Sequence, residues 1–107
     1  MQVFSERAVR RTRHSPLTPD QVADAAQILE RVERSRAEQL AALTTPVDAV
    51  ARAHHASVRR ILDAIRTARA QVAAGTYGTC ADCRSALDSD CLMARPWSIW
   101  CASCAQR

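Results

Sequence analysis

The sequence predicts a mainly α-helical fold, in which an antiparallel coiled-coil hairpin of two long helices precedes a small cysteine-rich module. Composition is the first observation behind this prediction, because a chain of 107 residues with two glycines and four prolines has few of the turns that β-rich proteins need. The second is that 21 residues are alanine, which buries too little area for a large globular core. The third is that all five cysteines follow residue 79.

The first helix is expected to begin at Pro19. Thr18 can cap it, Pro19 suits the first helical position, and Gln21 completes a capping box. Nothing breaks the helix before Leu43, and one face carries apolar residues at alternating three- and four-residue spacing: Val22, Ala25, Leu29, Val32 and Leu43. Residues 1–18 are expected to form a flexible N-terminal tail, whose arginines are either solvated or in contact with phosphate: Arg7, Arg10, Arg11 and Arg13.

The second helix is expected to begin by the same device. Thr45 can cap it, Pro46 takes the first position, and Asp48 lies three residues past the cap. It runs to about Ala74, where Gly75 is a suitable C-cap, and its apolar face is Val47, Val50, His54, Val58, Ile61, Ile65, Ala68 and Val72. Because the connection is short, the helices must turn back on each other. Residues 19–75 therefore form the predicted hairpin, with its tip near 44–50.

The basic residues are spread along the chain. All fifteen are arginine, and the formal net charge of +4 is not concentrated in a polybasic arm of the kind that binds nucleic acid non-specifically. The outer face of the second helix carries three arginines seven residues apart, which either face solvent or form a basic stripe for a partner: Arg52, Arg59 and Arg66.

No targeting segment is evident. Residues 1–16 contain four arginines and no continuous apolar stretch, and no window reaches the roughly 18 apolar residues of a membrane span. We therefore expect a soluble, cytoplasmic protein with no membrane contact. In a reducing compartment, five cysteines favour metal or redox chemistry over disulfides.

The cysteine spacing predicts a zinc site. Two pairs, each with two residues between the cysteines, are separated by seventeen residues: Cys80 with Cys83, and Cys101 with Cys104. Four thiolates suit one structural Zn²⁺ per chain, and residues 76–107 would form a Cys₄ zinc finger whose folding depends on the metal. An iron–sulfur centre or a rubredoxin-like iron site is the alternative, whereas a thioredoxin-like redox motif lacks its βαβ context. We expect the helical hairpin to persist without the metal.

The other chemically distinctive residues have simpler expected roles. Cys91 lies between the two pairs with no partner at knuckle spacing, so we interpret it as a free thiol. Trp97 and Trp100 either cover the zinc module and the hairpin base or stack on nucleic-acid bases. Neither a nucleophile–base pair nor a pair of carboxylates can be argued from spacing, so we expect no enzymatic activity.

The finger residues resemble a known family. The run Gly75-Thr76-Tyr77-Gly78-Thr79-Cys80-x-x-Cys83, then Leu92-x-Ala94-Arg95-Pro96 and Cys101-x-x-Cys104, resembles the C4 zinc finger of the DksA/TraR family, which are bacterial transcription regulators. The order of coiled-coil hairpin, Gly-Tyr-Gly and finger is also similar. The resemblance implies a hairpin that enters the secondary channel of RNA polymerase and a complex that can respond to guanosine tetraphosphate, without sequence-specific DNA binding.

The resemblance also implies which residues act at the hairpin tip. The family's tip motif, Asp-x-x-Asp-x-Ala, falls on the six residues 45–50. Asp48 matches its second acidic position, while Thr45 stands in place of the first Asp and Val50 in place of the Ala. Arg84 stands where glycine is usual in the family's finger, and Cys91 where arginine is usual.

The sequence therefore predicts a monomeric, non-enzymatic regulator that modulates transcription initiation by binding RNA polymerase. Thr45, Asp48 and Val50 would form the polymerase contact at the tip. A zinc-dependent adaptor for ribosomal or other RNA, using the arginine stripe of the second helix, is the alternative. A third hypothesis is an oxidation sensor, in which the cysteines release zinc when they are oxidised.

Overall fold

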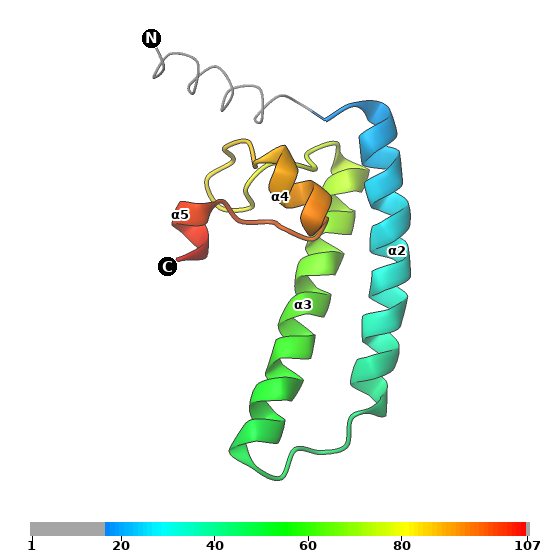
Figure 1. The fold of residues 1–107 in the computed structure, drawn as a ribbon, viewed down its shortest axis with the longest axis vertical. Helices are drawn as coiled ribbons and strands as arrows, with labels where there is room; N and C mark the ends of the chain where they lie inside the picture. The colour runs from blue at the N-terminus through cyan, green and yellow to red at the C-terminus, as the bar shows by residue number, and fades with distance from the viewer. Residues whose placement is uncertain (1–16, 107) are drawn as a thin grey trace.

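The computed structural model describes residues 17–106, in which four helices follow one another (Figure 1). They are the long helices α2 (Pro19–Ala42) and α3 (Ala49–Ala74) and the short helices α4 (Ser89–Ala94) and α5 (Ala102–Ala105). The fold is mainly helical, as predicted, with a single isolated β-bridge in the described part of the chain. The predicted tail and its four arginines lie outside the described residues.

The start of α2 confirms the predicted cap. The Gln21 backbone N–H donates to Thr18 Oγ1 at 3.1 Å, and the Thr18 N–H donates to Gln21 Oε1 at 2.9 Å. These reciprocal bonds satisfy backbone donors that a helix N-terminus leaves without intrahelical partners. The helix ends at Ala42, one residue before the predicted limit.

The predicted start of α3 is wrong by three residues. Asp48 itself is the N-cap, and its Oδ1 accepts a hydrogen bond of 2.8 Å from the Ala51 N–H. Aspartate caps a helix at least as well as threonine, so α3 begins after Asp48 and not after the predicted cap, Thr45. Residues 43–48, which we call the tip loop, therefore connect the helices.

The end of α3 is as predicted. Gly75 is the C-cap and adopts a left-handed conformation, with φ of 77°. Its N–H and that of Thr76 donate to the last carbonyls of the helix, the latter to Gln71 at 2.9 Å. Glycine reaches this conformation without a Cβ penalty, so the chain leaves the helix sharply and enters the cysteine module (residues 76–106).

The long helices pack side by side and share a core with the cysteine module. The chain runs along α2, crosses the tip loop and returns along α3 (Figure 1). The shared core consists of Leu29, Ile65, Ala68 and Ile99, each at most 4% exposed. Ile99 belongs to the module, and Tyr77 and Trp97 pack against the same cluster. The cluster thus spans both predicted parts of the chain.

The predicted apolar face of α3 is correct only in its second half. Val58, Ile65 and Ala68 are buried, but Val47, Val50 and His54 are exposed. Leu62, which the predicted seam omits, is only 2% exposed. The face is therefore wider near the module and lost near the tip loop. The cause is that α3 packs against a second unit only at its C-terminal end.

Glu33 joins the two long helices by ion pairs. One of its carboxylate oxygens accepts from Arg66 Nε at 3.0 Å, and the other accepts from Arg69 Nη1. The Arg69 guanidinium, with help from Arg66, holds the Glu33 pKa below its ordinary value of 4.5 against the opposing effect of burial. Arg66 is therefore tied to α2. The predicted stripe required it to lie on a face turned wholly outward, which it does not.

The cysteine module has a small core of its own. Cys80, Leu87 and Leu92 are buried together, and Leu17 and Tyr77 pack against them. Leu17 falls in the predicted tail, yet it lies close to Gly78. A Cβ atom added to Gly78 would be 3.6 Å from Leu17 Cδ1. The Tyr77 hydroxyl donates to the Pro96 carbonyl at 2.8 Å, and burial raises the Tyr77 pKa to about 12. Within residues 17–106, no helix has the length and apolar character needed to cross a bilayer.

Candidate metal centre

The first cysteine pair lies in a tight turn directly after α3. Gly78, with φ of 94°, redirects the chain, and Thr79 and Ala86 form the isolated antiparallel bridge. Inside this bridge the Cys80 N–H donates to the Ser85 carbonyl at 2.8 Å, and the Arg84 N–H donates back to the Cys80 carbonyl at 3.0 Å. These bonds fold the Cys80–Cys83 segment into a knuckle.

The second pair lies at the start of α5. Cys101 is the N-cap residue and Cys104 lies within the helix, so the three-residue spacing places both side chains on one side of the turn. The Ala81 N–H donates to the Ile99 carbonyl at 2.7 Å, which fastens the second knuckle to the first. Because Ile99 is in the shared core, the helix pair also supports this knuckle.

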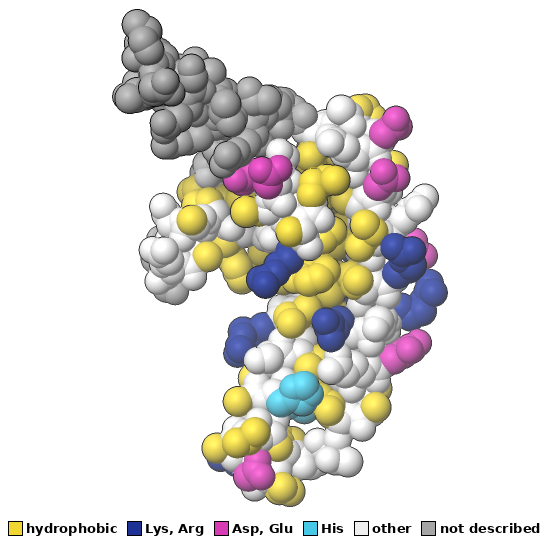
Figure 2. Space-filling model, viewed as in Figure 1, with side chains coloured by type: hydrophobic (Ala, Val, Ile, Leu, Met, Phe, Trp, Pro, Cys, Tyr) yellow, Lys and Arg dark blue, Asp and Glu magenta, His cyan; other side chains and the backbone are white. Residues whose placement is uncertain are grey.

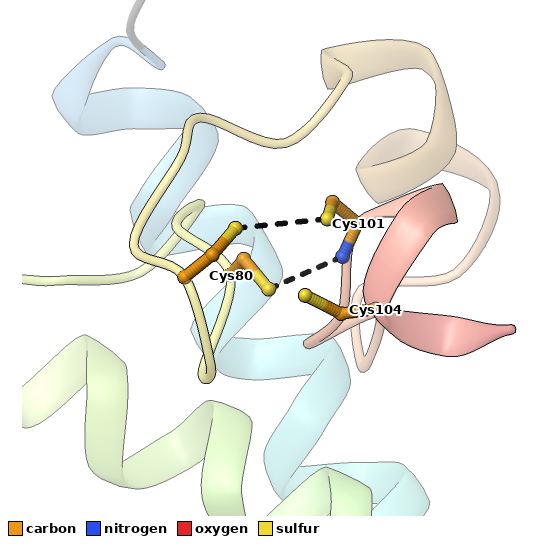
Figure 3. Close-up of side chains that lie close together, drawn as sticks. Cys80, Cys101 and Cys104 are labelled. Carbon is orange, nitrogen blue, oxygen red and sulfur yellow. Dashed lines mark hydrogen bonds between the residues drawn. The ribbon is translucent and has the colours of Figure 1, made fainter. Parts of the chain in front are cut away.

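The four sulfur atoms gather at one point. The Sγ atoms of Cys80, Cys83, Cys101 and Cys104 all lie within 4.8 Å of one another. Figure 3 shows the side chains of Cys80, Cys101 and Cys104 turned toward one another from the two knuckles. The Sγ atoms of Cys83 and Cys101 are 3.7 Å apart. A tetrahedral site with metal–sulfur bonds of about 2.3 Å requires sulfur atoms about 3.8 Å apart, so the residues fit a bound metal ion.

The surroundings of the site favour thiolates, the form in which cysteine binds metals. Backbone N–H groups, first that of Cys83 and then that of Cys101, lower the Cys80 pKa to about 6. The Cys101 N–H lies 3.4 Å from Cys80 Sγ. The Cys101 pKa is lowered as well, chiefly by the backbone N–H of Cys104. Cys80 is buried, Cys101 and Cys104 are half-buried, and Cys83 is exposed.

Cys91 stands outside the site. It lies in α4, a helix that the sequence analysis did not foresee, and its side chain is exposed. Asp88 caps this helix through a hydrogen bond of 2.9 Å from the Asp90 N–H, a local signal that could have revealed it. Of the five cysteines, the structure brings together the four that the spacing predicts.

The residues expected to contact a partner are distributed along the helix pair. Thr45 and Val50 are exposed at the tip loop and the first turn of α3, beside the cap residue Asp48. Arg52 and Arg59 are exposed, whereas Arg66 is the partner of Glu33 described above.

The two tryptophans differ. Trp97 packs against the shared core, as expected for a residue that covers the hairpin base, whereas Trp100 remains 48% exposed. Trp100 lines a groove of about 330 Å³ between α3 and the cysteine module, which Arg60 and Arg95 also line. The sequence carries no signal that pairs these two arginines, because they are far apart in the chain and line one groove only through the docking of the module on α3.

Three comparisons with known proteins found no match for this chain. It matches no family model, no curated protein and no solved structure.

Proposed function

We propose that the chain is a non-enzymatic regulator of transcription that binds RNA polymerase through the secondary channel. The observation that carries the proposal is the arrangement of its parts: four clustered cysteines close a module at one end of a helix pair, and the tip loop stands at the other end (Figure 1). This is the arrangement expected from the resemblance of the finger to the DksA/TraR family.

In this proposal the metal is one structural zinc ion per chain. Four thiolates are soft ligands that suit Zn²⁺ and exclude Mg²⁺ and Ca²⁺, which prefer oxygen. The four cysteines leave no position for a substrate or water, so the zinc would hold the two knuckles together. Iron in the same four-sulfur site is the competing assignment, and metal analysis distinguishes the two.

The helix pair would serve as an antiparallel coiled-coil hairpin that carries the tip loop to the polymerase. The described chain measures 57 × 29 × 20 Å, and α3 with 26 residues is about 39 Å long at 1.5 Å per residue. Such a slender shape suits a channel in a larger protein. The module remains outside, where it can rest on the channel rim.

Asp48 is the residue we propose to act at the end of the hairpin. One carboxylate oxygen is engaged as the cap of α3, which leaves the second oxygen free to face the partner. Thr45 is exposed in the same loop and offers a neutral hydroxyl where the family has a carboxylate. The tip would therefore act with a single negative charge.

RNA binding is the second candidate, and the groove at Trp100 favours it. An exposed indole flanked by Arg60 and Arg95 suits a stacked base and its phosphate. The arginine stripe contributes less than predicted, because Arg66 is paired with Glu33.

Capture from a bacterial lysate separates the two candidates. We expect the immobilised full chain to retain RNA polymerase subunits before and after nuclease treatment. Ribosomal material that is lost on nuclease treatment, with no polymerase, would instead support the RNA-binding adaptor. Trp100→Ala should then abolish that capture.

Transcription in vitro tests the role of the tip. We expect Asp48→Asn to bind polymerase as tightly as the wild type but to lose the effect on initiation, since asparagine retains the cap and removes the charge. Asp63→Asn, which removes a charge from an exposed position of α3 far from the tip loop, is the matched control and should act like the wild type. Equal activity of all three proteins would refute a role for the Asp48 charge.

A further inference from the structure

The end of the helix pair at the tip loop is apolar and nearly uncharged. Val47 is 87% exposed and Val50 79%, which makes them the most exposed large hydrophobic side chains among the described residues. From Leu40 to Ala53 the charged residues are Asp48 and Arg52, whose formal charges cancel, although 24% of the whole chain is charged. Figure 2 shows hydrophobic side chains at this end of the molecule, beside an acidic side chain and a partly hidden basic one, while most of the blue side chains in this view lie nearer the module.

The negative charge at this end, that of Asp48, is partly compensated by the helix that it caps. Asp48 Oδ1 accepts the Ala51 N–H at 2.8 Å, at the positive end of the α3 dipole. What the tip loop and the start of α3 present to a partner is therefore chiefly two isopropyl groups, with the exposed Arg52 at the end of the first helical turn. Their exposure has no folding benefit, since neither valine belongs to a core cluster.

We propose that Val47 and Val50 anchor the tip loop in an apolar cleft of a protein. The proposal rests on the proposed function and specifies the chemistry of the surface that receives the tip. A nucleic acid is disfavoured as the occupant, because Arg52 is the single arginine from Leu40 to Ala53 and the negative charge of Asp48 offsets it, so this end has no net positive charge to neutralise phosphates. The preceding arginine, Arg36, donates to Gln39 Oε1 at 2.7 Å.

A second copy of the chain is also disfavoured by area. Two tip loops meeting end to end would bury on the order of 500 Å² from their four valines, well below the roughly 1,200 Å² of a stable interface. A cleft surrounds the loop on several sides and adds contacts along both helices. A larger protein with a recessed apolar surface therefore fits the tip best.

Binding of the zinc-loaded full chain to immobilised, purified bacterial RNA polymerase tests the anchor. We expect Val47→Ala and Val50→Ala each to weaken binding about tenfold and the double variant on the order of 100-fold, because each change removes two apolar carbons from the contact. Both positions tolerate alanine, one in a loop and one in a first helical turn. Circular dichroism and zinc content verify that the variants are folded.

The controls separate an apolar anchor from other effects. Met93→Ala removes a 68% exposed apolar side chain from α4, remote from the tip loop, and should change affinity less than twofold. Asp63→Asn, at an exposed position of α3 far from the tip loop, should likewise leave affinity unchanged. The ratio of wild-type to double-variant affinity should be the same at low and high salt, because an apolar contact is not screened.

Three outcomes would overturn the anchor. In the first, the wild type binds polymerase and the double variant binds it equally tightly, an outcome that rejects the anchor but leaves the proposed function standing. The second is a wild type that does not bind polymerase, which removes the proposed function together with the anchor. The third is a dimer in sedimentation experiments that the double variant abolishes, which would assign the valines to a second copy.

Discussion

Replacing Ile99 with alanine is expected to destabilise the helix pair and the cysteine module together. Ile99 is 4% exposed and belongs to the shared core with Leu29, Ile65 and Ala68. Removing three buried carbons costs about 2.4 kcal/mol of transfer free energy. The cavity left behind raises the loss of unfolding free energy to about 3 kcal/mol. For a chain of this size, that loss lowers the melting temperature by about 15 °C.

Thermal unfolding with two probes measures this effect. Far-ultraviolet circular dichroism reports chiefly on α2 and α3, and fluorescence reports on the module, which holds both tryptophans. With zinc in excess, we expect both midpoints to fall by the same amount in Ile99→Ala. Met93→Ala, at an exposed position of the module, should shift neither. A fluorescence midpoint that falls alone, with the helical midpoint unchanged, would refute a core shared by the two parts.

Four further outcomes follow from single residues. Elemental analysis should find one zinc per chain in Cys91→Ser and none in Cys101→Ser; the reverse pattern would mean that the fourth ligand is misassigned. Denaturant unfolding should show a loss of about 1 kcal/mol for Asp48→Ala and less than about 0.5 kcal/mol for Asp48→Asn. Because the Glu33 pKa is lowered, its ion pairs stabilise the fold above pH 4.5 and are lost as the pH falls through the lowered value; Glu33→Gln should flatten that part of the stability–pH curve. Arg84 has φ of 67°, so Arg84→Gly should raise the unfolding free energy by about 1 kcal/mol, and a loss on substitution would show that the arginine side chain makes a compensating contact.

The features that the sequence predicted correctly depend on neighbouring residues. The capping box of Thr18 and Gln21 and the left-handed cap of Gly75 are decided within a few residues of the chain, and both form as expected. Each half of the four-cysteine cluster is also local in origin, since each cysteine pair forms its own knuckle. Only the meeting of the two knuckles needs the rest of the fold, and the seventeen intervening residues allow it.

The features that the sequence did not predict depend on competition or on distant contacts. Thr45 and Asp48 are both competent caps, and the spacing alone could not show that the second one starts α3. The predicted apolar face of α3 lacks Leu62, because its three- and four-residue spacing describes packing against a single partner helix. Near the module, α3 buries a wider face that includes Leu62. Ile99 and Leu29 belong to one core cluster although they are seventy positions apart, and the sequence carries no periodic signal for such a distant pairing.

Photo-crosslinking from the tip loop tests the central claim most directly. Thr45 is exposed in that loop, so it can be replaced by benzoylphenylalanine without disturbing the caps of α2 and α3. With purified RNA polymerase, we expect crosslinks to the walls of the secondary channel close to the catalytic centre. A chain that binds polymerase but crosslinks only to its outer surface would contradict the account.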